Sequence, residues 1–169
     1  SRLVIGADGI WSTIGKIIGV KQGCHHIGVC VYNEYPLSHK TLTQLYGNQR
    51  SVHIHLQPLG LVGYGWVFPK KEHVNIGVVE FRQAINPTRE KQNLQTSFAH
   101  YLKLLKDQKL IPKNLATKKF HGGVFPTCQA KRLAVNRVLL CGDAGGLVNP
   151  LTGEGIYYAM RSGEIASKI

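Results

Sequence analysis

Residues 137–160 read RVLLCGDAGGLVNPLTGEGIYYAM, and this stretch decides how the end of the chain folds. Residues 137–141 form a short apolar run that predicts a strand, residues 142–152 are rich in glycine and predict a loop, and residues 153–169 carry apolar side chains at helical spacing. A strand, a glycine-rich loop and a helix in this order aim the first turn of the helix at a ligand. The sequence therefore predicts an α/β unit that holds an anion or a polarised carbonyl group.

The predicted loop contains residues that suit a bound molecule. Gly142, Gly145 and Gly146 allow the backbone to approach a ligand closely. Asp143 supplies a carboxylate that accepts hydrogen bonds from sugar-like hydroxyl groups, although a carboxylate that only caps a turn or a helix is the alternative. Residues 150–155 add main-chain N–H groups and a helix dipole, which together stabilise negative charge.

The beginning of the chain predicts a second α/β fragment. The apolar run 3–5 meets Gly6-Ala7-Asp8-Gly9, and a short helix follows from about residue 11 to residue 18. For Asp8 and Gly9, a simple turn is the alternative to contact with a ligand. The chain opens without a methionine inside an apparent strand and stops at Ile169 inside an apparent helix, so both ends read as truncations.

The middle of the chain has a different texture. Between residues 27 and 81, short apolar or alternating runs separated by Gly, Pro and polar clusters predict an antiparallel meander. A period of two along residues 61–68 puts Tyr64, Trp66 and Phe68 on one side of a strand. These three side chains, called the aromatic wall below, either pack in a core or line a pocket.

A helix and a pair of histidines complete the middle region. Asn86-Pro87 supply an N-cap and a first-turn proline, and apolar residues over 94–105 predict an amphipathic helix. The helix is expected to be scaffold, with contact between its lysines and an acidic membrane as the alternative. His53 and His55 share one strand face but lack a third ligand at suitable spacing, so no metal is expected.

The composition is that of a folded protein. Of the 169 residues, 43% are apolar and 18% are charged, and there is no low-complexity tract. The net charge of +12 indicates an anionic contact, such as nucleotide phosphates, an acidic lipid surface or nucleic acid, or else a solvated basic surface.

The four cysteines form no C-x-x-C pair, which predicts free thiols and a reducing compartment. No run of about 18 apolar residues could span a membrane.

Three motifs resemble those of the p-hydroxybenzoate-hydroxylase-like flavoproteins. In order they are Gly6-Ala7-Asp8-Gly9 with Ser12, then Gly142-Asp143-Ala144, then Pro150-Leu151-Thr152-Gly153-Glu154-Gly155-Ile156. Between them, Tyr64-Gly65-Trp66-Val67-Phe68-Pro69-Lys70 is similar to the Y-x-W-x-F-P segment of the geranylgeranyl reductase family. Two features depart from the family. Gly77 is followed by Val78-Val79 where the family commonly has G-x-G, and the dinucleotide fingerprint G-x-G-x-x-G is absent from these residues.

The resemblance implies a fold and a set of sites. The fold class is α/β, or mixed α+β, with a Rossmann-like FAD-binding portion and an antiparallel substrate-domain sheet. Residues 1–22 and 127–169 would be FAD-binding segments, and residues 23–126 the substrate-binding sheet with its amphipathic helix. The isoprenoid pocket would be lined by Tyr64, Trp66 and Phe68. The implied cofactor-binding residues are Asp8, Gly9, Gly142, Asp143, Ala144, Gly145, Pro150, Gly153, Glu154 and Gly155.

The resemblance also implies a reaction, which is FAD-dependent reduction of carbon–carbon double bonds in the geranylgeranyl chains of a lipid precursor or prenylated compound. An external donor, NAD(P)H or ferredoxin, would reduce the flavin, and its N5 would pass a hydride to one carbon while a proton reaches the other. No residue is identified as the proton donor, and the chain alone is not expected to be a complete enzyme.

Two alternatives stay open at the level of sequence. The first is an FAD-dependent monooxygenase or halogenase of the same superfamily. The second is a basic, non-enzymatic binding module for an anionic membrane or nucleic acid, although no nucleic-acid-binding motif is present and nucleic acid is not expected as a partner. The expected location is the cytoplasm, with peripheral contact to a membrane left open.

Overall fold

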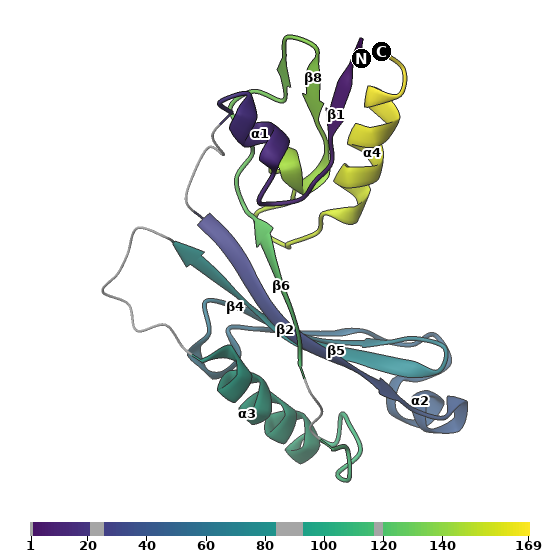
Figure 1. The fold of residues 1–169 in the computed structure, drawn as a ribbon. Coiled ribbons are helices and arrows are strands. Elements are labelled where there is room, and N and C mark those ends of the chain that lie inside the picture. The colour runs from purple at the N-terminus through teal and green to yellow at the C-terminus, as the bar shows by residue number, and fades with distance from the viewer. Residues whose placement is uncertain (1, 21–25, 84–92, 117–119) are drawn as a thin grey trace. The chain divides into compact units, whose positions relative to one another are not determined.

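The strands of the chain form two sheets in the computed structural model, which describes residues 2–20, 26–83, 93–116 and 120–169. The chain divides into two compact units (Figure 1). Unit 1 comprises Ser1–Gly28, Arg82–Pro87 and Val124–Ile169, and unit 2 comprises Val29–Phe81 and Thr88–Gly123. The predicted domain boundaries after residues 22 and 126 stay a prediction.

Unit 1 contains the small sheet, whose strand order is β1-β8-β7 in the described residues. The strands are β1 (Val4–Gly6), β7 (Ala134–Val135) and β8 (Val138–Leu140). The helices are α1 (Thr13–Ile17), the 3-10 helix η2 (Gly142–Gly145) and α4 (Ile156–Ala166). The predicted strand, glycine-rich loop and helix near the end of the chain are therefore confirmed, with the helix beginning later than residue 153.

Unit 2 contains most of the larger sheet, whose strand order is β3-β4-β5-β2-β6 in the described residues. Its strands are β2 (His26–Pro36), β3 (His53–Leu56), β4 (Gly63–Pro69), β5 (His73–Gln83) and β6 (His121–Pro126). Its helices are α2 (His39–Tyr46), the 3-10 helix η1 (Pro58–Gly60) and α3 (Leu94–Asp107). β3 and β4, and β4 and β5, pair antiparallel, which confirms the mixed fold class and the predicted meander for these three strands. The prediction was wrong for residues 42–46, a short apolar run counted as part of the meander, because they lie in helix α2.

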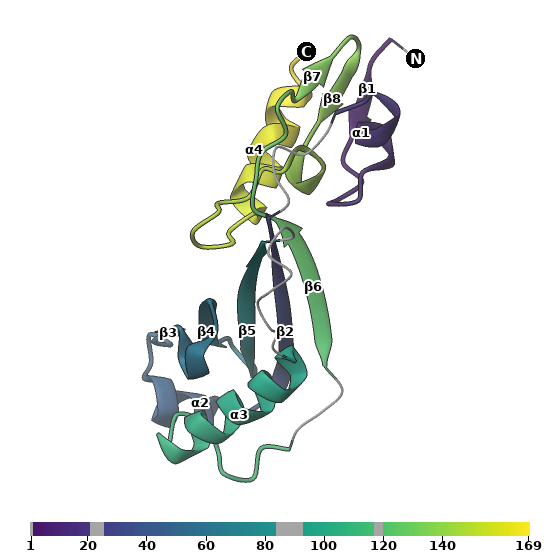
Figure 2. The same ribbon diagram turned by 90° about the vertical axis from the view of Figure 1, so that its left-hand side faces the viewer.

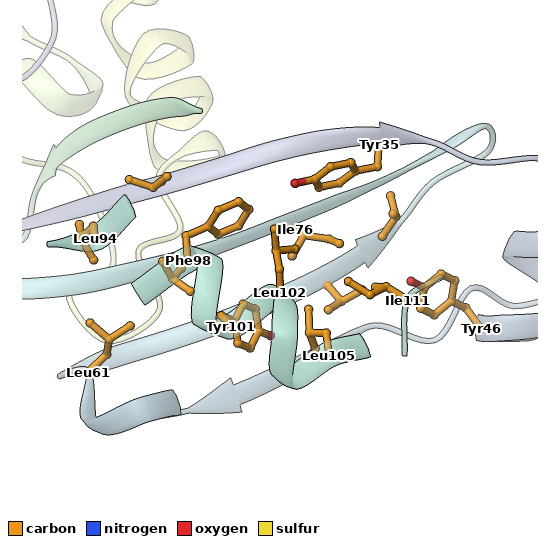
Figure 3. Close-up of a cluster of buried hydrophobic side chains, with 14 of the residues drawn as sticks. Tyr35, Tyr46, Leu61, Ile76, Leu94, Phe98, Tyr101, Leu102, Leu105 and Ile111 are labelled. Carbon is orange, nitrogen blue, oxygen red and sulfur yellow. The ribbon is translucent and has the colours of Figure 1, made fainter. Parts of the chain in front are cut away.

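The hydrophobic core of unit 2 lies between one face of this sheet and α3 (Figures 2 and 3). Phe98, Tyr101 and Leu105 of α3 have no exposed surface and pack with Val67 and Ile76 of the sheet. Such burial of apolar surface contributes about 25 cal/mol per Å² and is the main favourable term in folding. The amphipathic helix is thus scaffold along its apolar face, as the sequence predicted.

The start of α3 is fixed by Asn93. Its side-chain oxygen accepts hydrogen bonds from the Gln95 and Thr96 N–H groups over 3.0 and 3.4 Å, which satisfies two of the unpaired donors of the first turn. The start predicted at Asn86-Pro87 lies outside the described residues. In the parts of the chain that the structure describes, no helix is both long and apolar enough to cross a bilayer.

The prediction of free thiols needs a correction. Cys30 and Cys141 are free, whereas Cys128 is disulfide-bonded, and Cys24 lies outside the described residues. A disulfide requires two Cα atoms within about 7 Å of each other, and this separation is set by tertiary structure. The absence of a C-x-x-C motif therefore could not exclude a disulfide.

Candidate functional site

Two loops that are far apart in the sequence leave the same edge of the small sheet. β1 and β8 run parallel with Gly6 paired to Leu140, and the Cys141 N–H donates to the Gly6 carbonyl over 2.9 Å (Figure 1). Because neighbouring parallel strands end on the same side, the turn at residues 7–9 and the loop at residues 142–146 emerge together. Ligands of open α/β sheets bind at the carboxyl ends of the strands.

The Asp8 carboxylate is bound to the start of α1. Its Oδ1 accepts a hydrogen bond from the Ser12 hydroxyl over 2.6 Å, and its Oδ2 accepts from the Thr13 and Ile14 N–H groups over 2.7 and 3.2 Å. These hydrogen bonds, led by the one from Ser12, hold the pKa of the Asp8 carboxyl below its ordinary value. Asp8 is therefore a local helix cap, and its contact with a cofactor stays a prediction.

Asp143 is placed differently. It lies in η2 directly after β8, in a loop that Gly142 and Gly146 close with φ angles of 55° and 68°. Its Oδ1 lies 3.6 Å from the position that a Cβ on Gly155 would take, so the carboxylate faces the cap residue of α4. Burial raises the pKa of the Asp143 carboxyl. Within the described residues this carboxylate accepts no hydrogen bond.

Asn149 gives the loop before α4 its shape. Its side-chain oxygen accepts from the Leu151 and Thr152 N–H groups over 2.9 and 3.1 Å, and its own N–H donates to the Glu154 carbonyl over 2.8 Å. The Glu154 carboxylate accepts from the Tyr157 N–H over 2.7 Å and so caps the helix. The loop is therefore closed by its own hydrogen bonds, and one donor of the first helical turn is already occupied.

Ser162 joins α4 to the glycine-rich loop. Its hydroxyl accepts from the Gly142 N–H and donates to the Ala159 carbonyl, both over 3.0 Å. A Cβ on Gly142 would lie 3.2 Å from the Ala159 Cβ, which shows how closely the loop packs on the helix. These contacts fix the loop and the first two turns of α4 as one piece.

The aromatic wall lies on the face of unit 2's sheet that points away from α3. Along β4, Val67 is buried in the core beneath α3, whereas Tyr64, Trp66 and Phe68 alternate to the opposite face. The ring centroids of Tyr64 and Trp66 are 6.0 Å apart, and those of Trp66 and Phe68 are 6.2 Å apart. The wall is thus not part of the α3 core, and its role as a pocket lining stays a prediction.

The same open face continues onto β3. Ile54 and Leu56 pair with Trp66 and Tyr64 and share their face of the sheet. They are 54% and 79% exposed, which is unusual for large apolar side chains in a contiguous group. The exposed apolar face is therefore wider than the three residues of the aromatic wall, and its contact with a substrate stays a prediction.

Most of this chain matches a known protein family. Residues 1–164 match the family described as "FAD binding domain". The chain belongs to this FAD-binding domain family. Its resemblance to geranylgeranyl reductases is also confirmed, because the digeranylgeranylglycerophospholipid reductase of Methanococcus vannielii is 31% identical over 170 residues. That alignment covers 100% of this chain and 40% of the relative, so the chain spans well under half of the relative's length.

Solved structures support the same fold for the FAD-binding domain. A geranylgeranyl bacteriochlorophyll reductase-like protein from Thermoplasma acidophilum matches with a TM-score of 0.75 and 23% identity, over 99% of this chain and 40% of that chain. Aklavinone-11 hydroxylase, solved with FAD and aklavinone, matches with a TM-score of 0.56 and 16% identity, over 98% of this chain and 30% of that chain. At these identities the likeness concerns the fold.

One observation indicates that the glycine-rich loop is suited to FAD. The Asp143 carboxylate is partly buried and, in the part of the chain that the structure describes, lacks a donor. A desolvated carboxylate without a donor is unfavourable, and a ligand hydroxyl group relieves that strain by donating to it. The polyhydroxylated chain of FAD offers such donors, so Asp143 would hold the cofactor there.

The structure brings together some of the sequence-predicted residues and shows others that the sequence reasoning missed. Asp143, Glu154 and Gly155 lie around the start of α4, whereas Asp8 is engaged with α1. Asn149 and Ser162 were missed. The Asn-Pro pair at 149–150 is a turn signal that could have revealed Asn149, but nothing local marks a serine in the middle of a helix.

The contact between Asp8 and α1 predicts a pH-dependent effect. Since the folded pKa of Asp8 lies below its unfolded value of 3.8, the stability it contributes is complete above that value and is lost as the pH falls through the folded pKa. Asp8→Ala is therefore expected to lower the melting temperature at neutral pH, by a difference that shrinks below about pH 4. Thermal unfolding of the parent and of Asp8→Ala, followed by Trp11 fluorescence at several pH values, tests this. A difference in melting temperature that does not change with pH would contradict it.

Proposed function

We propose that this chain is the flavin-contacting and substrate-contacting part of an enzyme that reduces carbon–carbon double bonds in isoprenoid chains with FAD. The observation that carries the proposal is the aromatic wall, which is free of the α3 core and extends over a contiguous apolar face. A geranylgeranyl chain is long, apolar and methyl-branched, and such a chain binds to a surface of this kind by apolar burial. The 31% identical relative is named as a digeranylgeranylglycerophospholipid reductase, which supports the same class of substrate.

Two groups of residues in the chain would have separate roles, one binding the prenyl chain and the other binding the cofactor. Tyr64, Trp66 and Phe68 would hold the prenyl chain and exclude water from its double bonds. Asp143 would accept hydrogen bonds from cofactor hydroxyl groups, and the Gly155 end of α4 would direct its dipole at developing negative charge. FAD, when bound, supplies the hydride chemistry, and the protein supplies position and a dry surface.

Two partners complete the proposal. An external donor, NAD(P)H or ferredoxin, would deliver electrons, because the chemistry consumes reducing equivalents. A lipid-chain substrate would also bring the protein to a membrane surface, and the net charge of +12 would favour an anionic one.

The test uses the full-length protein that contains these residues, desalted and then reduced without oxygen in the presence of a digeranylgeranyl glycerophospholipid. We expect flavin absorption bands and a product that gains two hydrogen atoms for each reduced double bond, measured by mass spectrometry. Trp66→Ala is expected to lose about tenfold or more in kcat/KM, because truncating a large aromatic contact removes about 1.5–3 kcal/mol of apolar binding.

Two other outcomes would replace this proposal. Rapid NAD(P)H-dependent oxygen consumption, with no saturated product, would indicate a monooxygenase or halogenase instead. A colourless protein that takes up no added FAD and binds anionic vesicles or nucleic acid with steep salt dependence would indicate the basic binding module.

A further inference from the structure

Trp66 is held at the edge of its ring by a polar network on the open face of the sheet. Its indole Nε1–H donates to the Asn75 Oδ1 over 2.6 Å, and the Asn75 Nδ2 donates to the Glu34 Oε1 over 3.2 Å. The same Glu34 oxygen lies 3.3 Å from the Lys70 Nζ and 3.5 Å from the His73 Nε2. The network thus connects β2, β4, β5 and the turn between β4 and β5.

The donors and acceptors in this network fit together in only one way. An indole N–H can only donate, so Asn75 must present its oxygen to Trp66. An ionised carboxylate can only accept, so Asn75 must present its nitrogen to Glu34. Hydrogen bonds from Asn75 and Lys70, together with the nearby His73, keep the pKa of the Glu34 carboxyl below its ordinary value. An anionic Glu34 therefore fixes the orientation of the Asn75 amide.

A second constraint acts beneath the ring of Trp66. Trp66 and Gly77 are directly paired across β4 and β5, and a Cβ on Gly77 would lie 2.1 Å from the Trp66 Cζ2. The indole therefore lies flat on the backbone of β5, in space that only glycine leaves open. Tyr64 and Phe68 flank it on either side, so any rotation of the indole would change the middle of the aromatic wall.

We propose that Asn75 and Glu34 are positioning residues that hold the Trp66 indole flat on β5 and thereby set the depth of the surface that receives a prenyl chain. This inference rests on the proposed function for its role with substrate, but the hold on Trp66 does not. An indole N–H that loses its partner in a partly buried site seeks water or another acceptor. Without Asn75 the ring would lift from Gly77 into the space of the substrate.

The first experiment measures the indole N–H directly and needs neither substrate nor FAD. In 15N-labelled protein, the indole cross-peak that disappears in Trp66→Phe is assigned to Trp66, and its exchange with solvent is followed by NMR. Asn75→Leu, which is close in volume but cannot accept a hydrogen bond, is expected to speed this exchange by about tenfold, the equivalent of one hydrogen bond. The control Asn48→Leu makes the same change at an exposed position and is expected to leave the exchange unaltered.

Variants of Glu34 keep the test decisive if Asn75→Leu folds poorly. Glu34→Leu should also speed the exchange, since the Asn75 amide is then free to rotate away. Glu34→Gln should restore most of the protection, because its side-chain oxygen still accepts from Asn75. Unchanged exchange in the Leu variants of both residues would overturn the proposal.

The second measurement concerns substrate. In the full-length enzyme, Asn75→Leu is expected to raise KM for a geranylgeranyl substrate by about tenfold while kcat stays within about twofold, because the loss is in binding. A fall in kcat at unchanged KM would overturn the role in substrate fit. If the parent reduces no prenyl chain, the proposed function fails, and the exchange result alone decides whether Asn75 and Glu34 hold Trp66.

Discussion

Asp143→Ala is expected to weaken FAD binding by about 10- to 100-fold, because a hydrogen bond to a charged group is worth about 1.5–3 kcal/mol. The carboxylate lies at the carboxyl end of β8, beside the Gly155 cap of α4, and among the described residues accepts no hydrogen bond. Its free acceptors suit the hydroxyl groups of the cofactor. Titration of full-length protein with FAD, followed by quenching of flavin fluorescence, measures the change.

Asp143→Ala should not lower the stability of the protein without FAD, although it weakens FAD binding. Burial raises the pKa of the Asp143 carboxyl in the folded state, so the charged form destabilises the fold at neutral pH and this effect fades as the pH falls through the raised pKa. Asp143→Ala is therefore expected to keep or slightly raise the melting temperature without FAD. Loss of both FAD binding and folding would contradict this interpretation, as would unchanged affinity.

Two further variants sharpen the comparison. Asp143→Asn keeps one acceptor oxygen and loses the charge, so its affinity for FAD should fall between those of the parent and Asp143→Ala. Asp107→Ala removes a carboxylate at the exposed end of α3 and should leave FAD binding unchanged. An equal effect of both alanine variants would show that net charge, and not the position of Asp143, governs FAD affinity.

Gly146→Ala is expected to destabilise the protein by about 2–5 kcal/mol, a large part of the stability of a typical domain. Gly146 has a φ angle of 68°, in the left-handed region that alanine adopts only at a cost. A Cβ at this position would also lie 2.1 Å from the backbone carbonyl oxygen of Cys128, which cannot move away as a flexible side chain could. Urea unfolding followed by Trp11 fluorescence measures the loss.

The control for this variant is a glycine on the helix that follows. Gly163 lies in α4, and a Cβ there would meet nothing within 4 Å. Gly163→Ala should therefore stabilise the protein by about 0.5–1 kcal/mol, because alanine favours helix and glycine does not. The two variants make the same chemical change with opposite expected signs, and a shared sign would show that the geometry of the Gly146 loop is not what limits stability.

The sequence predicted well where a structural signal is contained in a few neighbouring residues. The strand at 137–141, the loop after it and α4 follow from local periodicity and glycine content, and the meander follows from alternating runs. The alternation of Tyr64, Trp66 and Phe68 was likewise readable, because the strand period is two. The Cys128 disulfide was not, because it depends on the distance between residues that the fold brings together.

The roles of particular site residues depended on neighbours distant in sequence. Asp8 and Asp143 look alike in sequence, each beside glycine after an apolar run, yet Asp8 is occupied by α1 and Asp143 accepts no hydrogen bond in the described residues. In the sequence, Gly77 belongs to a motif that departs from the G-x-G of the family. The structure shows why glycine is needed there, because Gly77 is paired with Trp66 and a side chain would collide with the indole. Glu34 is separated from Asn75 by 41 residues in the chain, so no local pattern could connect them.

By itself the sequence determined most of the strands and helices, the order of the motifs and the family, because these depend on residue type and spacing along the chain. The exception is α2, whose residues 42–46 were predicted as part of the meander. Only the tertiary structure decided which face of β4 packs under α3, which carboxylate is left without a donor among the described residues, and what holds Trp66 in place. Each of these depends on strand pairing and packing between distant segments. Such contacts form only when the chain folds, since burial and hydrogen-bond satisfaction belong to the whole arrangement and not to any single stretch of it.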